Sequence, residues 1–87
     1  MSEMYNFINE KMKVLLVIND NSMEIDGIIV CPLNQQEIAN QVPCGKPKVN
    51  QIIRELIAEG YVETKRTKGR YMLTEKAEIL VKGLLDK

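Results

Sequence analysis

The sequence has 87 residues, of which 45% are hydrophobic and 28% charged, and we expect residues 1–87 to form one small domain. Histidine is absent and only two cysteines occur, so the commonest catalytic base and most zinc sites are excluded. We therefore expect no enzyme, no catalytic residues and no metal or other cofactor. Because no apolar run could span a bilayer and no leader is recognisable, we expect a cytoplasmic protein without a membrane partner.

The charge is unevenly distributed, although the total is zero. Residues 45–70 contain seven Lys or Arg and three Glu, a net charge of +4, which leaves −4 for the remainder. A polyanion responds to the local charge, because salt screens more distant charges beyond about 8 Å. This segment is therefore a candidate for nucleic-acid contact, and an ordinary solvated face is the alternative.

The first predicted element is a helix at about residues 3–18, where Ser2 can act as the N-cap. Its apolar residues recur at spacings of three and four, and Tyr5 and Val14 widen the apolar arc to about 200°. An arc this wide is more than one core contact needs. A polar turn follows, and the run at residues 28–31 predicts a short edge strand before Pro32.

Two further helices are predicted in the middle of the chain. Asn34 and Glu37 have the spacing of a capping box, which predicts a helix at about residues 35–42. The next helix, at about residues 46–59, begins after Gly45 and carries an inward apolar stripe. That stripe consists of Val49, Ile52, Ile53, Leu56 and Ile57.

The last third of the chain predicts a hairpin and a helix. Two β-prone runs within about residues 61–73 are joined by a short loop that contains Gly69. Thr74 can cap a final helix at about residues 75–86. The predicted fold is mainly α with a small β-hairpin, in the order α-β-α-α-β-β-α.

This layout resembles the winged helix-turn-helix of bacterial transcription regulators. The resemblance lies in Leu33–Ala39, Val42–Val49 and Ile53–Glu63, and Leu73–Ala77 is similar to the segment that follows the wing in the MarR family and its GntR-like relatives. It implies a sequence-specific regulator that binds double-stranded DNA, with residues 46–59 as the recognition helix and residues 61–73 as the wing. MarR proteins are longer, and this chain has no room for a small-molecule effector domain.

The candidate DNA contacts lie on the outer face of the recognition helix and in the wing. Gln51 suits adenine and Arg54 suits guanine in the major groove, whereas Lys46 at the helix start suits a phosphate. Ordinary solvated polar residues are the alternative for all of them. The complete predicted set is Lys46, Lys48, Asn50, Gln51, Arg54, Lys65, Arg66, Lys68 and Arg70.

Self-association is a separate prediction. Helix-turn-helix proteins usually bind two half-sites as dimers, and the first helix has surplus apolar surface. Ile79 faces away from the inward side of the last helix, near Gly83, although an isolated exposed isoleucine is also common. We predict a homodimer whose interface includes Tyr5, Val17, Ile79 and Gly83.

The favoured function is a repressor that occupies its operator as a homodimer. A winged-helix protein-interaction module is the alternative from another class, and neutral net charge favours it slightly. A plasmid or phage replication or partition factor would use the same DNA surface. A redox switch at Cys44 is a further hypothesis, because a helix N-terminus lowers the pKa of a nearby thiol.

Overall fold

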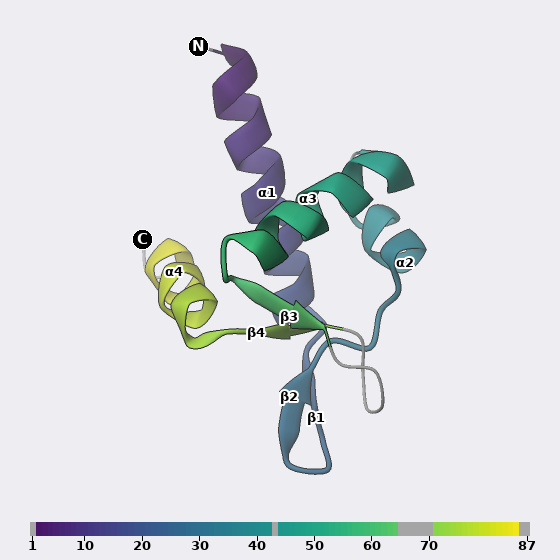
Figure 1. Cartoon of the computed structure of the whole chain (residues 1–87), viewed down its shortest axis with the longest axis vertical. Helices are drawn as coiled ribbons and strands as arrows, with labels where there is room; N and C mark the ends of the chain where they lie inside the picture. Colours follow the sequence, from purple (N-terminus) through teal and green to yellow (C-terminus); the bar gives the residue numbers. More distant parts are fainter. Residues whose placement is uncertain (1, 43, 65–70, 86–87) are drawn as a thin grey trace.

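The computed structural model of the chain describes residues 2–42, 44–64 and 71–85. Helices and two small hairpins alternate along this part of the chain (Figure 1). In order, the elements are α1 (Ser2–Asp20), β1 (Met23–Ile25), β2 (Ile28–Val30), α2 (Gln35–Ala39), α3 (Lys46–Ala58), β3 (Val62–Thr64), β4 (Tyr71–Leu73) and α4 (Glu75–Leu85). The mainly helical, winged-helix fold class is confirmed, with one strand more than predicted.

The helix ends differ slightly from the predicted bounds. α1 continues two residues beyond the expected end, to Asp20, whereas α2 ends at Ala39, three residues before the expected end. The chain after α2 forms a turn, in which the Gln41 N–H donates to the Ile38 carbonyl. α2 is therefore one short helix, and it precedes α3 in the chain.

The helix starts follow the local sequence. The Asn34 side chain accepts a hydrogen bond from the Glu37 N–H at 2.8 Å, and the Glu37 carboxylate accepts one from the Asn34 N–H at 2.9 Å. The predicted capping box is thus confirmed. At α4, the Thr74 hydroxyl accepts a hydrogen bond from the Ala77 N–H at 3.3 Å.

The prediction of a single strand before α2 is wrong. β2 pairs with β1 in an antiparallel hairpin, with Met23 opposite Val30 and Ile25 opposite Ile28. The turn residues Asp26 and Gly27 have φ values of 52° and 82°, as in a type I′ turn. Asp-Gly between apolar residues is a strong hairpin signal, so this element could have been recognised from the sequence.

The two hairpins are joined by one β-bridge. The Cys31 N–H donates to the Tyr71 carbonyl at 2.7 Å, and the Tyr71 N–H donates to the Cys31 carbonyl at 3.2 Å. β3 and β4 pair in an antiparallel register, with Val62 opposite Leu73. The β1–β2 hairpin is therefore anchored to the candidate wing, and it projects from the end of the molecule opposite the N-terminus of α1 (Figure 1).

One hydrophobic core lies between the helices and the β3–β4 hairpin. α1 contacts α2, α3, α4 and β4, and α3 crosses it (Figure 1). The largest fully buried side chains come from α1, β2 and the residue after it, α2, α3 and β3: Val14, Leu15, Ile18, Val30, Cys31, Ile38, Val49, Ile52, Ile53, Leu56 and Val62. Among the described residues, no charged side chain is buried in this core, and no helix has the length and apolarity needed to cross a membrane.

Two isoleucines of α3 provide a stability test of this packing. Ile53 is 1% exposed, whereas Ile57 is 39% exposed. The prediction that Ile57 belongs to the inward stripe is therefore wrong, because at about 100° per residue it lies at the edge of that face. We expect Ile53→Ala to lower the free energy of unfolding by about 2 to 5 kcal/mol, because it leaves a cavity in the core. Ile57→Ala, the matched control, should cost about 1 kcal/mol or less. Urea denaturation measures both, and equal losses would contradict the described orientation of α3.

Candidate nucleic-acid interface

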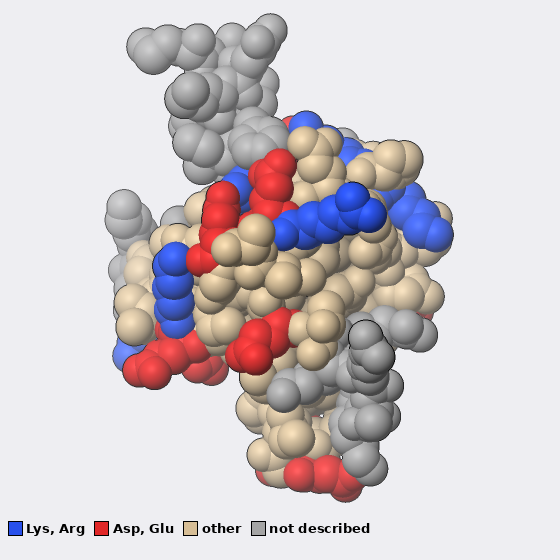
Figure 2. Space-filling model, in the orientation of Figure 1, with Lys and Arg blue, Asp and Glu red and all other residues tan. Residues whose placement is uncertain are grey.

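α3 presents a polar face because its apolar face is in the core. Val49, Ile52, Ile53 and Leu56 are buried on one side of the helix. Figure 2 shows Lys and Arg side chains over α3, with acidic side chains toward its C-terminal end. The exposed positions of α3 are Lys46, Pro47, Gln51, Arg54, Ile57 and Ala58, and Lys48, Asn50 and Glu55 are half-buried.

The N-terminal part of α3 is fixed to α2. The Asn50 amide nitrogen donates to Gln35 Oε1 at 2.9 Å. Beside this contact, Lys46 lines an open hollow of about 400 Å³ together with Asn34, Gln36 and Tyr71. Asn50 thus joins the two helices, whereas Lys46 is exposed at the helix start, where an anion could approach it.

The C-terminal part of α3 is fixed to α1 by an ion-pair network that the sequence reasoning missed. Lys11 Nζ lies 3.3 Å from Glu55 Oε1 and 3.0 Å from both carboxylate oxygens of Glu59. Gln51 Nε2 donates to Glu55 Oε2 at 3.3 Å. A chain of contacts therefore runs from α1 to the outer face of α3.

The Lys11 ammonium group is well placed to hold its positive charge. Burial acts to lower the pKa of Lys11, but hydrogen bonds and charge attraction from Glu59 and Glu55 outweigh it, so the pKa is raised above its ordinary value of 10.5. The side chain is only 13% exposed, although it ends in a charge. Protonated Lys11 thus connects α1 to the two glutamates at the C-terminal part of α3.

The C-terminal end of α3 is fixed to the start of α4. Lys76 Nζ donates to the Glu59 carbonyl at 2.8 Å and lies 4.4 Å from the centre of the Tyr61 ring. The Thr74 hydroxyl donates to the Gly60 carbonyl at 2.7 Å. Gly60 has a φ of 83°, which allows the chain to leave α3 toward β3.

The redox hypothesis for Cys44 required a lowered thiol pKa, and the structure gives a raised one. Burial raises its pKa above the ordinary value of 9.0, and Glu10 raises it further through its charge and a hydrogen bond. Lys48 and Lys13 act in the opposite direction but do not outweigh these effects. The expectation of a lowered thiol pKa at the start of α3 is therefore wrong.

The predicted wing contacts Lys65, Arg66, Lys68 and Arg70 lie outside the described residues. The structure does describe the flanking strands, β3 and β4, and their antiparallel pairing. Of the predicted interface residues, Ile79 is 69% exposed on α4, Gly83 is exposed and Val17 is half-buried. The side chain of Tyr5 lies outside the described part, and the first turns of α1 extend beyond the rest of the molecule (Figure 1).

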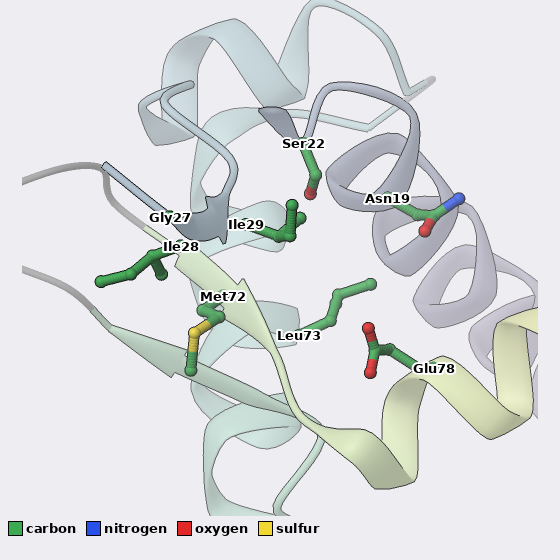
Figure 3. A pocket seen from close by; sticks show the side chains of 8 residues that line it. All are labelled: Asn19, Ser22, Gly27, Ile28, Ile29, Met72, Leu73 and Glu78. Atoms are coloured by element: carbon green, nitrogen blue, oxygen red, sulfur yellow. The ribbon is translucent and has the colours of Figure 1, made fainter. Parts of the chain in front are cut away.

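A second hollow lies between the β1–β2 hairpin, β4 and the start of α4. It has a volume of about 320 Å³, and Ile28, Ile29, Met72 and Leu73 form its apolar part (Figure 3). Asn19, Ser22 and Glu78 supply its polar side. No group of three His, Cys, Asp or Glu residues in the described ranges could hold a metal ion.

Comparisons with known proteins agree on the fold. No protein-family model matches the chain, and no curated protein sequence matches it. The reduced Fe(II) CO-sensing protein from R. rubrum is similar in structure, with a TM-score of 0.76 and 21% identity over 93% of this chain. The transcriptional repressor BigR from Xylella fastidiosa has a TM-score of 0.60 and 26% identity, over 98% of this chain and 82% of its own.

These likenesses support the winged-helix prediction at the level of fold. The chain spans 38% of the CO-sensing protein, so only that part of it is comparable. The chain thus matches winged-helix transcription regulators, without a specific link to the MarR or GntR-like groups.

The Lys11 network predicts a pH-dependent contribution to stability. Lys11→Met should lower the free energy of unfolding by about 1 kcal/mol at pH 7, because it leaves Glu55 and Glu59 without their cation. Since the pKa of folded Lys11 is raised, the contribution is fully present below pH 10.5 and is lost as the pH rises through the folded value.

Urea denaturation of wild type and Lys11→Met between pH 7 and 11.5 measures this dependence. Lys13→Met, which removes an exposed lysine of the same helix, is the control and should change stability little. A difference between wild type and Lys11→Met that stays constant above pH 10.5 would contradict the assigned role of Lys11.

Proposed function

We propose that this chain is a DNA-binding transcription regulator of the winged-helix class and that it acts as a repressor. The observation that carries this proposal is α3, which is fixed near both ends and turns Lys46, Gln51 and Arg54 outward. The similarity to BigR, a transcriptional repressor, supports the direction of regulation. Repression then follows from occupation of the operator in the cytoplasm, where the DNA lies.

The exposed residues of α3 divide into two proposed roles. Gln51 and Arg54 read base edges in the major groove, because their side chains can form paired hydrogen bonds with adenine and guanine respectively. Lys46 and Lys48 bind the phosphate backbone near the helix start. Asn50 contributes less than the sequence suggested, because its amide nitrogen already donates to Gln35.

The wing completes the proposed contact through its cations. Lys65, Arg66, Lys68 and Arg70 lie between β3 and β4 in the sequence and give the segment 45–70 its net charge of +4. We propose that they bind the backbone or the minor groove beside the recognition helix. The segments that resemble MarR-like and GntR-like regulators in sequence fit this assignment, and the CO-sensing function of the R. rubrum protein is not carried over.

A protein-interaction module is the second candidate, and one observation favours it. Met23 is 52% and Ile28 is 38% exposed, and the register of the β1–β2 hairpin places both on the same face of it. Exposed apolar side chains that lie close together often mark protein contacts. A replication or partition factor would bind DNA through the same α3 face, so it shares the proposed chemistry.

DNA binding should depend steeply on salt. With five or six phosphate contacts at about 0.9 per contact, the slope of log affinity against log salt should be near −5. Arg54→Ala should reduce discrimination at one base pair by about 1 to 3 kcal/mol, whereas Lys46→Ala should weaken all duplexes alike and reduce the slope by about 1. Selection from random duplexes followed by fluorescence anisotropy measures each, and affinity independent of salt would refute the proposal.

We further propose that the regulator is a homodimer in which α1 and α4 meet the same elements of a second copy. Its support is the exposure of Ile79 on α4 and the extension of the first turns of α1 beyond the core (Figure 1). A two-fold dimer is the commonest oligomer and would present two α3 helices to two half-sites. Val17, Gly83 and Tyr5 are its other proposed contacts.

The dimer has a direct test at Ile79. Analytical ultracentrifugation should show twice the chain mass for the wild type at micromolar concentration. Ile79→Glu should shift it toward monomer, because two-fold symmetry buries two unpaired charges. Ile29→Glu places the same charge at an exposed isoleucine of the β1–β2 hairpin and should leave the dimer intact. A wild-type monomer at high micromolar concentration would exclude this assembly.

A further inference from the structure

The side-chain amide of Gln51 is oriented before any base is bound. An amide can present either its nitrogen or its oxygen to a neighbour, but a carboxylate can only accept hydrogen bonds. Gln51 Nε2 donates to Glu55 Oε2 at 3.3 Å, so Glu55 holds the nitrogen on its side. Gln51 Oε1 therefore faces away from Glu55, and one N–H of the amide stays available.

Glu55 is itself held from outside α3. Its Oε1 atom lies 3.3 Å from Lys11 Nζ, and Lys11 is anchored in turn by both oxygens of Glu59 at 3.0 Å. Each Glu55 oxygen thus has a different partner, which restricts rotation of the carboxylate. The ammonium group also offsets a negative charge that would otherwise repel phosphate.

We propose that Glu55, held by Lys11, is a positioning residue that determines which base edge Gln51 recognises. The proposal rests on the proposed function, and it adds a specificity role for a carboxylate and for a lysine of α1. A fixed amide presents one acceptor and one donor in a set order. That order fits the N6 donor and N7 acceptor of adenine and opposes guanine, whose N7 and O6 are both acceptors.

The restraint can be tested without DNA. The ¹H–¹⁵N resonances of the Gln51 side-chain amide report its hydrogen bond to Glu55. Glu55→Gln and Lys11→Met should both move these resonances, whereas Lys11→Arg keeps a cation for Glu55 and should leave them near their wild-type positions. Unchanged resonances in Glu55→Gln would overturn the proposal, because the amide would not be held by the carboxylate.

The effect on recognition is measured as a ratio of dissociation constants. The base pair read by Gln51 is the one at which Gln51→Ala loses its preference among selected duplexes. At that pair the wild type should favour A·T over G·C by about 5- to 100-fold. Glu55→Gln and Lys11→Met should each lower this ratio by at least about threefold, and Lys11→Arg should retain it.

A double-mutant cycle separates positioning from a general structural effect. In the Gln51→Ala background, Glu55→Gln should not change the ratio further, because there is no amide left to orient. A structural defect would instead weaken binding to all duplexes alike, with or without Gln51. Thermal unfolding of Glu55→Gln shows that the variant folds, since Glu59 still anchors Lys11.

The outcomes distinguish this proposal from the proposed function. If the wild type selects a duplex sequence but Glu55→Gln keeps the full ratio at the Gln51 base pair, the positioning role is wrong and DNA recognition stands. If Gln51→Ala changes no base preference, the positioning role is wrong as well. If the wild type binds no duplex, both the proposed function and the positioning role fall.

Discussion

The burial of one side of α3 is the constraint on which the rest of the structure depends. Val49, Ile52, Ile53 and Leu56 fill the centre of the core, so the helix cannot rotate about its axis without exposing them. Because a helix has a fixed angular spacing, this packing also determines where Gln51 and Arg54 point. The candidate recognition surface is therefore a direct consequence of the hydrophobic core, and it needs no ligand to form.

Polar contacts then secure the same helix near both of its ends. The Gln35–Asn50 hydrogen bond fixes its N-terminal part, the Lys11 ion pairs fix its C-terminal part, and Lys76 and Thr74 hold the backbone just after it ends. Surface ion pairs contribute little stability individually. Their larger consequence is orientation, because each joins a different neighbouring element to α3.

Much of the local structure could be predicted because its signals lie within a few residues. The capping box of Asn34 and Glu37 and four of the five predicted stripe residues of α3 were found where the sequence placed them, whereas Ile57 is exposed. The strand that was not predicted, β1, also had a local signal, because Asp26-Gly27 is typical of a two-residue hairpin turn. In this part of the chain, only the apolar run at residues 28–31 was predicted as a strand. The pKa of the Cys44 thiol could not be predicted from local signals. The N-terminus of α3 was expected to lower it, but burial and Glu10 of α1 raise it.

The sequence by itself determined the winged-helix class, the outward face of α3 and the concentration of cations between residues 45 and 70. These depend on periodicity, capping and composition, which act within one element. Only the tertiary structure decided that Lys11 meets Glu55 and Glu59, that Asn50 is joined to Gln35, and that Cys31 is bridged to Tyr71. These partners are separated by 15 to 48 positions, and no local pattern encodes a contact that forms only when the core brings two elements together.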